Sequence, residues 1–373
     1  MSLNIFYYND SKYPFYFILL LEFLRNIFDL NFIENNLKSY NCTLPILLIL
    51  SNFILINAQD FQITIHARDS LINEYESIQY EPDSSIYYSS NTLKELYDGT
   101  IWREENNLNG YKIAGVLGAI AVVDFAGYNQ LKNLWYTQRH SYWHSLDFTE
   151  DFRKYRWMDK FGHAMDAYFV SDLTAKAYRW SGFSGNSSIL LGALTGWLWM
   201  MQIEISDGFF LEWGYSWGDV LANSVGSGFY ILQQTNYELF GGLHPKISYH
   251  KSNAWKEARY IKVPGSIIDD YEGMTFWLGV NPYHYFPDSW KQDYPKWLAP
   301  LGIAFGYGAK GIGIDPQGGR HEFFVGLDID ISKIPIGEGS GLVKFLKSEF
   351  NFIRLPLPAV RITPSGVWYG LYF

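Results

Sequence analysis

The centre of this chain has the pattern of four helices that are rich in apolar residues. The first, at residues 111–136, is apolar almost all round, so it must be buried in protein or in lipid. Loops rich in glycine and serine separate the later stretches. We predict an apolar, antiparallel four-helix bundle within a helical domain at residues 107–240. The other three helices are expected at about residues 159–179, 187–206 and 216–234.

Small residues recur at four-residue steps on two of these helices. Gly192 is followed by Gly196, and Gly218 by Ala222. Such spacing lets two helix backbones approach each other closely.

After residue 240 the sequence pattern changes to short runs in which apolar and polar residues alternate, with frequent proline and glycine. These runs predict about five antiparallel strands, so residues 241–373 form a C-terminal β-rich segment. The fold class is therefore mainly α with an added sheet, that is, α+β. The clearest strands are expected at residues 273–280, 301–308, 321–331 and 366–373.

The N-terminus has the pattern of an export signal. Lys38 precedes an apolar stretch at residues 44–56, and Ala58 supplies a small residue for cleavage. An uncleaved anchor or a buried helix is the alternative. We assign residues 1–58 to this signal, with a start codon placed too far upstream, and residues 59–106 to a polar lead-in.

Cys42 is the single cysteine of the chain, which excludes an internal disulfide and a cysteine-based metal site. The residues before it, 38–41, read Lys-Ser-Tyr-Asn and do not form a lipobox.

Charge and aromatic content limit the class of partner. The net charge is −9 and the pI about 5.4, which disfavours nucleic acid as a partner. Aromatic residues make up 19% of the chain, and such side chains are favoured at membrane interfaces. We expect a membrane or a membrane protein as partner, while the sequence leaves the oligomeric state open.

Each of the three later helices carries ionisable residues on one face, because the members of each pair are three or four positions apart. Where helices run up and down, the starts of the first and third lie beside the end of the second. The sequence therefore predicts one polar cluster at one end of the bundle. The pairs are Asp159 with His163, Glu204 with Asp207, and Asp219 with Asn223.

Ordinary structural roles compete with this interpretation. Ser216 and Asp219 form a capping box, and Asp159 has the position of an N-cap. His163 has the alternative of a hydrogen-bonded core histidine, and Asp207 that of a turn residue. Asn223 and Glu204 have no such local explanation.

We predict His163, Glu204 and Asp219 as catalytic residues. The predicted binding residues are Asp159, Lys160, Asp207, Ser216 and Asn223. The chemistry stays open between acid–base catalysis, a divalent metal site and a structural network that fixes helix register. No cofactor is predicted, with a divalent metal as the alternative, and the sequence does not decide whether the chain is an enzyme.

These motifs resemble those of the YfiM-like family of predicted periplasmic lipoproteins of unknown function. The likeness covers roughly residues 110–235, and the C-terminal part is similar to longer members found in Bacteroidetes. A more distant likeness is to VanZ-like membrane proteins, although Asp207 stands where their pattern has glutamine. The resemblance implies an envelope location and a shared polar cluster, but no reaction.

We therefore expect an exported envelope protein of the periplasm, associated with the outer membrane. Its cluster would bind or act on the head group of an envelope lipid or glycan. The alternative is a non-catalytic scaffold or assembly partner in the outer membrane, because the terminal strand at residues 366–373 resembles the closing strand of outer-membrane barrels.

Overall fold

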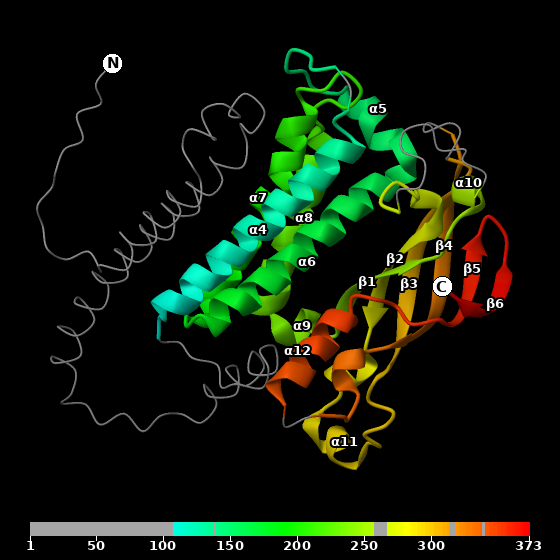
Figure 1. Ribbon diagram of the computed structural model, residues 1–373. Coiled ribbons are helices and arrows are strands. Elements are labelled where there is room, and N and C mark those ends of the chain that lie inside the picture. The colour runs from blue at the N-terminus through cyan, green and yellow to red at the C-terminus, as the bar shows by residue number, and fades with distance from the viewer. Residues whose placement is uncertain (1–106, 138, 257–266, 313–317, 338–339) are drawn as a thin grey trace, which may run out of the picture.

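The computed structural model describes residues 107–373 except 138, 257–266, 313–317 and 338–339 (Figure 1). The predicted signal at residues 1–58, the lead-in at 59–106 and Cys42 lie outside the described residues. In the described part, a layer of helices lies against an antiparallel sheet (Figure 1). The prediction of a mixed α+β fold is thus confirmed.

Three long helices form the interior of the helical layer. They are α6 (Met158–Trp180), α7 (Gly185–Asp207) and α8 (Trp217–Thr235). Gly192 and Gly196 let α7 lie directly on α6, because a Cβ atom at Gly192 would stand 2.5 Å from the Ser171 carbonyl oxygen. The predicted close approach at this pair of small residues is present.

The first helix, α4 (Gly110–Leu134), lies on the outside of this trio. Val116 is its single buried residue, so a four-helix bundle is not confirmed. Both α4 and α7 are long and apolar enough to cross a membrane. However, 61% of the apolar segment of α7 is buried in the protein, against 6% for α4, so α7 is an interior helix.

The sheet has six strands in the order of the chain, each antiparallel to its neighbour. The sequence predicted four of them and missed the first and the fifth. The strands are β1 (Leu243–Tyr249), β2 (Met274–Val280), β3 (Leu301–Lys310), β4 (Arg320–Ile329), β5 (Leu357–Thr363) and β6 (Val367–Tyr372).

Short elements connect the long ones. Before α6 come α5 (Phe148–Arg153) and the 3-10 turn η3 (Lys154–Trp157), and α9 (Tyr237–Phe240) follows α8. The remaining short elements are α10 (Asn253–Lys256), η4 (Tyr271–Gly273), η5 (Pro282–Tyr285), α11 (Asp288–Asp293), η6 (Ile331–Lys333) and α12 (Gly341–Phe350).

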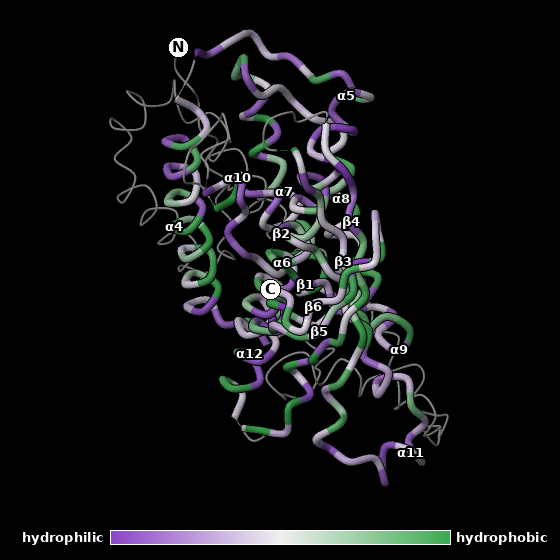
Figure 2. The backbone as a smooth tube through the Cα atoms, turned by 90° about the vertical axis from the view of Figure 1, so that its right-hand side faces the viewer, coloured by the Kyte–Doolittle hydropathy of each residue, from purple (hydrophilic) through white to green (hydrophobic). Residues whose placement is uncertain are grey.

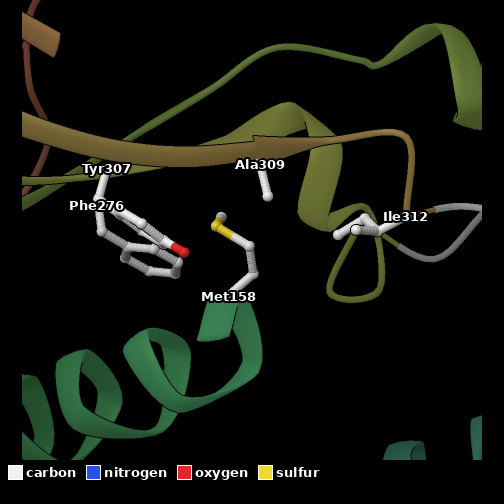
Figure 3. Close-up of a cluster of buried hydrophobic side chains, with 5 residues drawn as sticks. All are labelled: Met158, Phe276, Tyr307, Ala309 and Ile312. Atoms are coloured by element: carbon white, nitrogen blue, oxygen red, sulfur yellow. The ribbon is translucent and has the colours of Figure 1, made fainter. Parts of the chain in front are cut away.

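The start of α6 packs on the sheet through an apolar cluster (Figure 3). Met158, at the first position of α6, is fully buried against Phe276 of β2 and Tyr307 and Ala309 of β3. The Phe161 ring stacks on the Tyr307 ring with centroids 4.6 Å apart. This contact fixes the N-terminal end of α6, which carries the first polar motif, against the sheet.

Candidate functional site

The three polar motifs meet at one end of the helical layer, where α6 and α8 begin and α7 ends. Around His163 and Lys160, five of the predicted side chains make direct contacts, and Asp207 interacts electrostatically with His163. All eight side chains that the sequence predicts for a site therefore lie there. They are Asp159, Lys160, His163, Glu204, Asp207, Ser216, Asp219 and Asn223. The structure shows this proximity, while the role of each residue stays a prediction.

His163 is the residue that links all three helices. Its Nδ1 atom lies 3.1 Å from Asn223 Oδ1 and 3.4 Å from Glu204 Oε1. Its Nε2 atom lies 4.0 Å from Asp159 Oδ1 and 3.9 Å from Asp219 Oδ1. Nδ1 thus faces an amide oxygen and a carboxylate, and Nε2 faces two carboxylates.

Lys160 forms the second centre of the cluster. Its ammonium group lies 2.8 Å from Asp219 Oδ1, 3.0 Å from Asp151 Oδ1 and 3.1 Å from Asp159 Oδ2. The lysine side chain is 8% exposed, so this charge is held by ion pairs rather than by water. Asp219 and Asp159 each face both cations, which joins the two centres into one network.

The sequence analysis missed three members of this network. Asp151 of α5 is buried and accepts a hydrogen bond of 2.6 Å from the Ser216 hydroxyl. The Tyr271 hydroxyl of η4 donates to Asp159, and the Tyr136 hydroxyl donates to Asp207, both at 2.6 Å. Asp151 and Tyr271 lie in short connecting elements, and Tyr136 lies just past the end of α4, where the sequence predicts the last turn of an apolar helix. None of these positions indicates a polar site from the sequence alone.

The chain reaches this geometry through a strained turn. Tyr155, Arg156 and Trp157, just before α6, have φ values of 53°, 50° and 65°. Side chains other than glycine adopt this left-handed region at a cost of about 1–2 kcal/mol each. The turn directs the chain from α5 back into α6, so that Asp151 and Lys160 face each other.

The N-caps of α6 and α8 test the capping roles that the sequence offers for Asp159 and Ser216. Ser216 is the N-cap of α8, since its hydroxyl accepts from the Asp219 backbone N–H at 2.9 Å. Asp159 is not an N-cap, because Trp157 holds that position and Asp159 lies in the first turn of α6. Asp159 is therefore left to pair with Lys160 and Tyr271.

Burial and mutual attraction shift the titration of the two cations. Burial disfavours the imidazolium, but Asp219, Glu204 and Asp159 outweigh it and raise the pKa of His163 to about 10. Burial likewise opposes the charge of Lys160, yet Asp159 and the other carboxylates hold its pKa above the usual value. Both groups are therefore cationic at neutral pH.

The pKa values of the carboxyl groups are shifted in opposite directions. Burial would raise the pKa of Asp159, but Lys160 and His163 hold it well below the usual range. Burial raises the pKa of Glu204 and of Asp219, although His163 opposes both shifts. Burial also raises the pKa of Asp207 to about 7, against the hydrogen bond from Tyr136. Asp207 is thus partly protonated at neutral pH, as carboxyl groups of acid–base sites are.

The cluster has an open side and an open donor. Asp159 and His163 are its most exposed members in the ion-pair network, with side chains 19% and 15% exposed. Asn223 is fully buried, and its Nδ2 atom has no hydrogen-bond partner among the described residues. A ligand would therefore meet Asp159 and His163 first.

A mostly apolar cavity of about 260 Å³ lies between α4, α6 and α7 beside the cluster. Its wall includes Tyr136, which donates to Asp207, and Ile203, which precedes Glu204. Asp166, less than one turn after His163, also lines it and is exposed to solvent. The cavity thus joins an apolar space to the polar end of the helices.

One ligand atom each from Asp159, His163 and Asp219 lies within 4.8 Å of the others. Two carboxylates and an imidazole suit a divalent metal. Lys160 already places a cation 2.8 Å from Asp219 and 3.1 Å from Asp159, so a metal would compete with the ammonium group. The three side chains are of types that bind divalent metals, while the Lys160 ammonium group already neutralises part of their negative charge.

Comparison with known proteins bears on the part of the chain that holds these motifs. Residues 148–235 match the family model of predicted periplasmic lipoproteins (DUF2279). This family has no known function, and the matched segment contains α5 to α8 with the whole polar cluster except Tyr136 and Tyr271. No curated protein and no solved structure matches the chain.

The family description agrees with the predicted envelope and periplasmic location. The finer likenesses to YfiM and VanZ proteins and the association with the outer membrane stay predictions. Cys42, which is not in a lipobox, lies outside both the matched segment and the described residues.

Proposed function

We propose that this is a membrane-apposed protein of the cell envelope whose polar cluster binds the head group of an envelope lipid or glycan. The observation that carries the proposal is the environment of His163. One imidazole lies within 4.0 Å of three carboxylates from three helices, on the side of the cluster that reaches solvent.

The charge of the cluster selects the type of head group. Five carboxyl groups surround one lysine and one histidine. Even with some carboxyl groups protonated, this balance favours hydroxyl or ammonium groups over a small anion. Asp159 and Asp219 would accept hydrogen bonds from the head group, and His163 Nε2 would donate one.

The neighbouring cavity favours a lipid over a glycan. It is lined mainly by apolar side chains of α4, α6 and α7, among them Leu131, Val170 and Met200. An amphiphile could place a short alkyl chain there while its head group meets the cluster.

Amphiphiles of equal chain length and different head group would test this proposal. We expect the Tm rise with octyl glucoside, below its micelle concentration, to depend on the polar cluster, and any Tm rise with octyl phosphate to be independent of it. His163→Gln and Asp219→Asn should abolish the octyl glucoside shift, and Gly118→Ala on the outside of α4 should retain it. A shift of equal size in all variants, or lower Tm values with unchanged binding, would identify a structural network instead.

A divalent metal is the second candidate, favoured by the spacing of Asp159, His163 and Asp219. Isothermal titration of Mn²⁺ and Zn²⁺ into EDTA-treated protein would test it. Binding at one site that Asp159→Asn and Asp219→Asn both remove would support a metal, and absence of heat with both ions would exclude these two metals.

The third candidate is a non-catalytic scaffold in the outer membrane. It is supported by exposed side chains on and after the last strand, since Trp368, Leu371 and Phe373 are 67%, 62% and 53% exposed. Cross-linking in cells from position 371 should then capture a barrel protein in equal amount. Loss of that product in Trp368→Ser, with Tyr142→Ser as the exposed control, would identify the strand as the contact.

A further inference from the structure

A second cavity, of about 430 Å³, lies at the opposite end of the helical layer. The later part of α6, the end of α8, β1 and α12 form its walls. Asp172 in this wall is roughly 14 Å along α6 from His163, at 1.5 Å per residue. Figures 1 and 2 show α9, α11 and α12 together at this end, away from α5 and α10. The cavity is therefore separate from the polar cluster.

The lining of this cavity is basic, although the whole chain has a net charge of −9. Asp172 is the one carboxylate among its described lining residues, and this side chain pairs with Lys176. Glu349 pairs with the same lysine at 2.6 Å. Lys296 and Lys344 add two further positive charges to the lining, which makes the cavity attractive to an anion. The lining lysines are Lys176, Lys296, Lys333, Lys344 and Lys347.

A buried amide gives the cavity an open hydrogen-bond acceptor. Gln234 lines the wall and is 2% exposed. Its Oε1 atom has no hydrogen-bond partner among the described residues. Leaving such an acceptor unsatisfied is costly, and a ligand hydroxyl would satisfy it. The pocket therefore suits an anion that also carries hydroxyl groups.

The rim of the cavity is apolar on its outer side. Leu342, Leu346 and Phe350 follow one another at four-residue steps on α12 and are 67%, 41% and 56% exposed. Lys344 and Lys347 of the same helix line the cavity instead. A helix with an apolar outer stripe and basic residues beside it is typical of binding to an anionic lipid surface.

We propose that this pocket binds the head group of an anionic glycerophospholipid. The lysines contact the phosphate, Gln234 accepts from a glycerol hydroxyl, and the apolar stripe of α12 enters the lipid surface together with Trp297, which is 71% exposed. This site is independent of the proposed function of the polar cluster, since the two share no residue.

Vesicle co-sedimentation of the purified full chain tests the pocket. We expect binding to phosphatidylcholine vesicles that contain phosphatidylglycerol, and little to phosphatidylcholine alone. The double variant Lys296→Ala, Lys344→Ala should bind roughly 30-fold more weakly, given the usual effect of two lysines at such a surface. Lys251→Ala, Lys256→Ala, around α10 at the far end, is the matched control and should bind as the wild type does.

Three results would overturn the proposal. The first is equal weakening in both double variants, which would mean unspecific attraction of the whole protein. The second is binding of glycerol phosphate or inorganic phosphate, followed by NMR, without vesicle binding, which would assign the pocket to a soluble phosphate. The third is vesicle binding that Trp297→Ser leaves unchanged. The proposal expects Trp297→Ser to weaken vesicle binding but not glycerol phosphate binding.

Discussion

His163 Nδ1 lies 3.1 Å from Asn223 Oδ1, although 60 residues separate the two in the chain. Asn223 is fully buried on α8, and His163 stands in the second turn of α6. A contact of this kind fixes both the rotation and the axial register of the two helices. It also directs Nε2 of the imidazole toward Asp159 and Asp219, on the open side of the cluster.

The raised pKa of His163 predicts a specific pH dependence of stability. Because the pKa of His163 is about 10 in the folded protein and 6.5 for a free histidine side chain, the contribution of the imidazolium is complete below pH 6.5 and is lost as the pH rises toward 10. The difference in free energy of unfolding between wild type and His163→Gln should therefore be largest near pH 6 and shrink toward pH 10. Urea unfolding at several pH values measures it, and a constant difference would show that the fold does not raise the pKa of His163.

Lys160 should be the residue on which the stability of the cluster depends most. Lys160→Met leaves Asp151, Asp159 and Asp219 without their ammonium partner, and loss of one partner in a buried ion pair costs roughly 3–5 kcal/mol. Denaturant unfolding at pH 7 should show this loss. Lys291→Met removes a surface pair with Asp288 and should change stability by less than about 0.5 kcal/mol. Equal effects of the two variants would contradict the description of Lys160.

The close contact of α6 and α7 makes Gly192 sensitive to a single methyl group. A Cβ atom there would lie 2.5 Å from both the Ala175 Cβ atom and the Ser171 carbonyl oxygen. We expect Gly192→Ala to lower the free energy of unfolding by roughly 1–3 kcal/mol. Gly118→Ala on α4 meets no atom within 4 Å and should raise stability by about 0.5–1 kcal/mol. Thermal melting of both variants measures these changes in stability. A Gly192→Ala variant as stable as the wild type would mean that α6 and α7 can move apart to accommodate the methyl group.

The positions of the long helices and of four strands were predictable, because apolar periodicity records them locally. The meeting of His163, Glu204 and Asp219 was predictable as well, since each lies near a helix end in an up-and-down arrangement. The weak packing of α4 was not, because a helix that is apolar almost all round has the same sequence pattern whether protein or lipid surrounds it.

Some residues of the polar cluster could not be predicted, because local sequence patterns do not record contacts between distant segments. Asp151 and Tyr271 come from short connecting elements and Tyr136 from the end of the first helix, and their contacts depend on how the chain turns between elements. The left-handed turn at residues 155–157, which brings Asp151 to Lys160, contains no glycine that would have indicated it. Strand β1 was missed because its residues 243–249 include proline and lysine, which are unusual in a strand.

Asp207 should act against stability at neutral pH. Burial raises its pKa to about 7 from the usual 3.8, so the folded protein favours the protonated carboxyl and its ionisation costs stability as the pH rises from about 4 to 7. Asp207→Asn keeps an oxygen for the Tyr136 hydroxyl and removes this cost. The variant should be more stable than wild type at pH 8 by at least about 1 kcal/mol, and nearly equal below pH 4. Urea unfolding at both pH values measures this, with Asp288→Asn, whose side chain is 89% exposed, as control. A destabilised Asp207→Asn at pH 8 would show that the carboxylate is ionised and stabilised by His163.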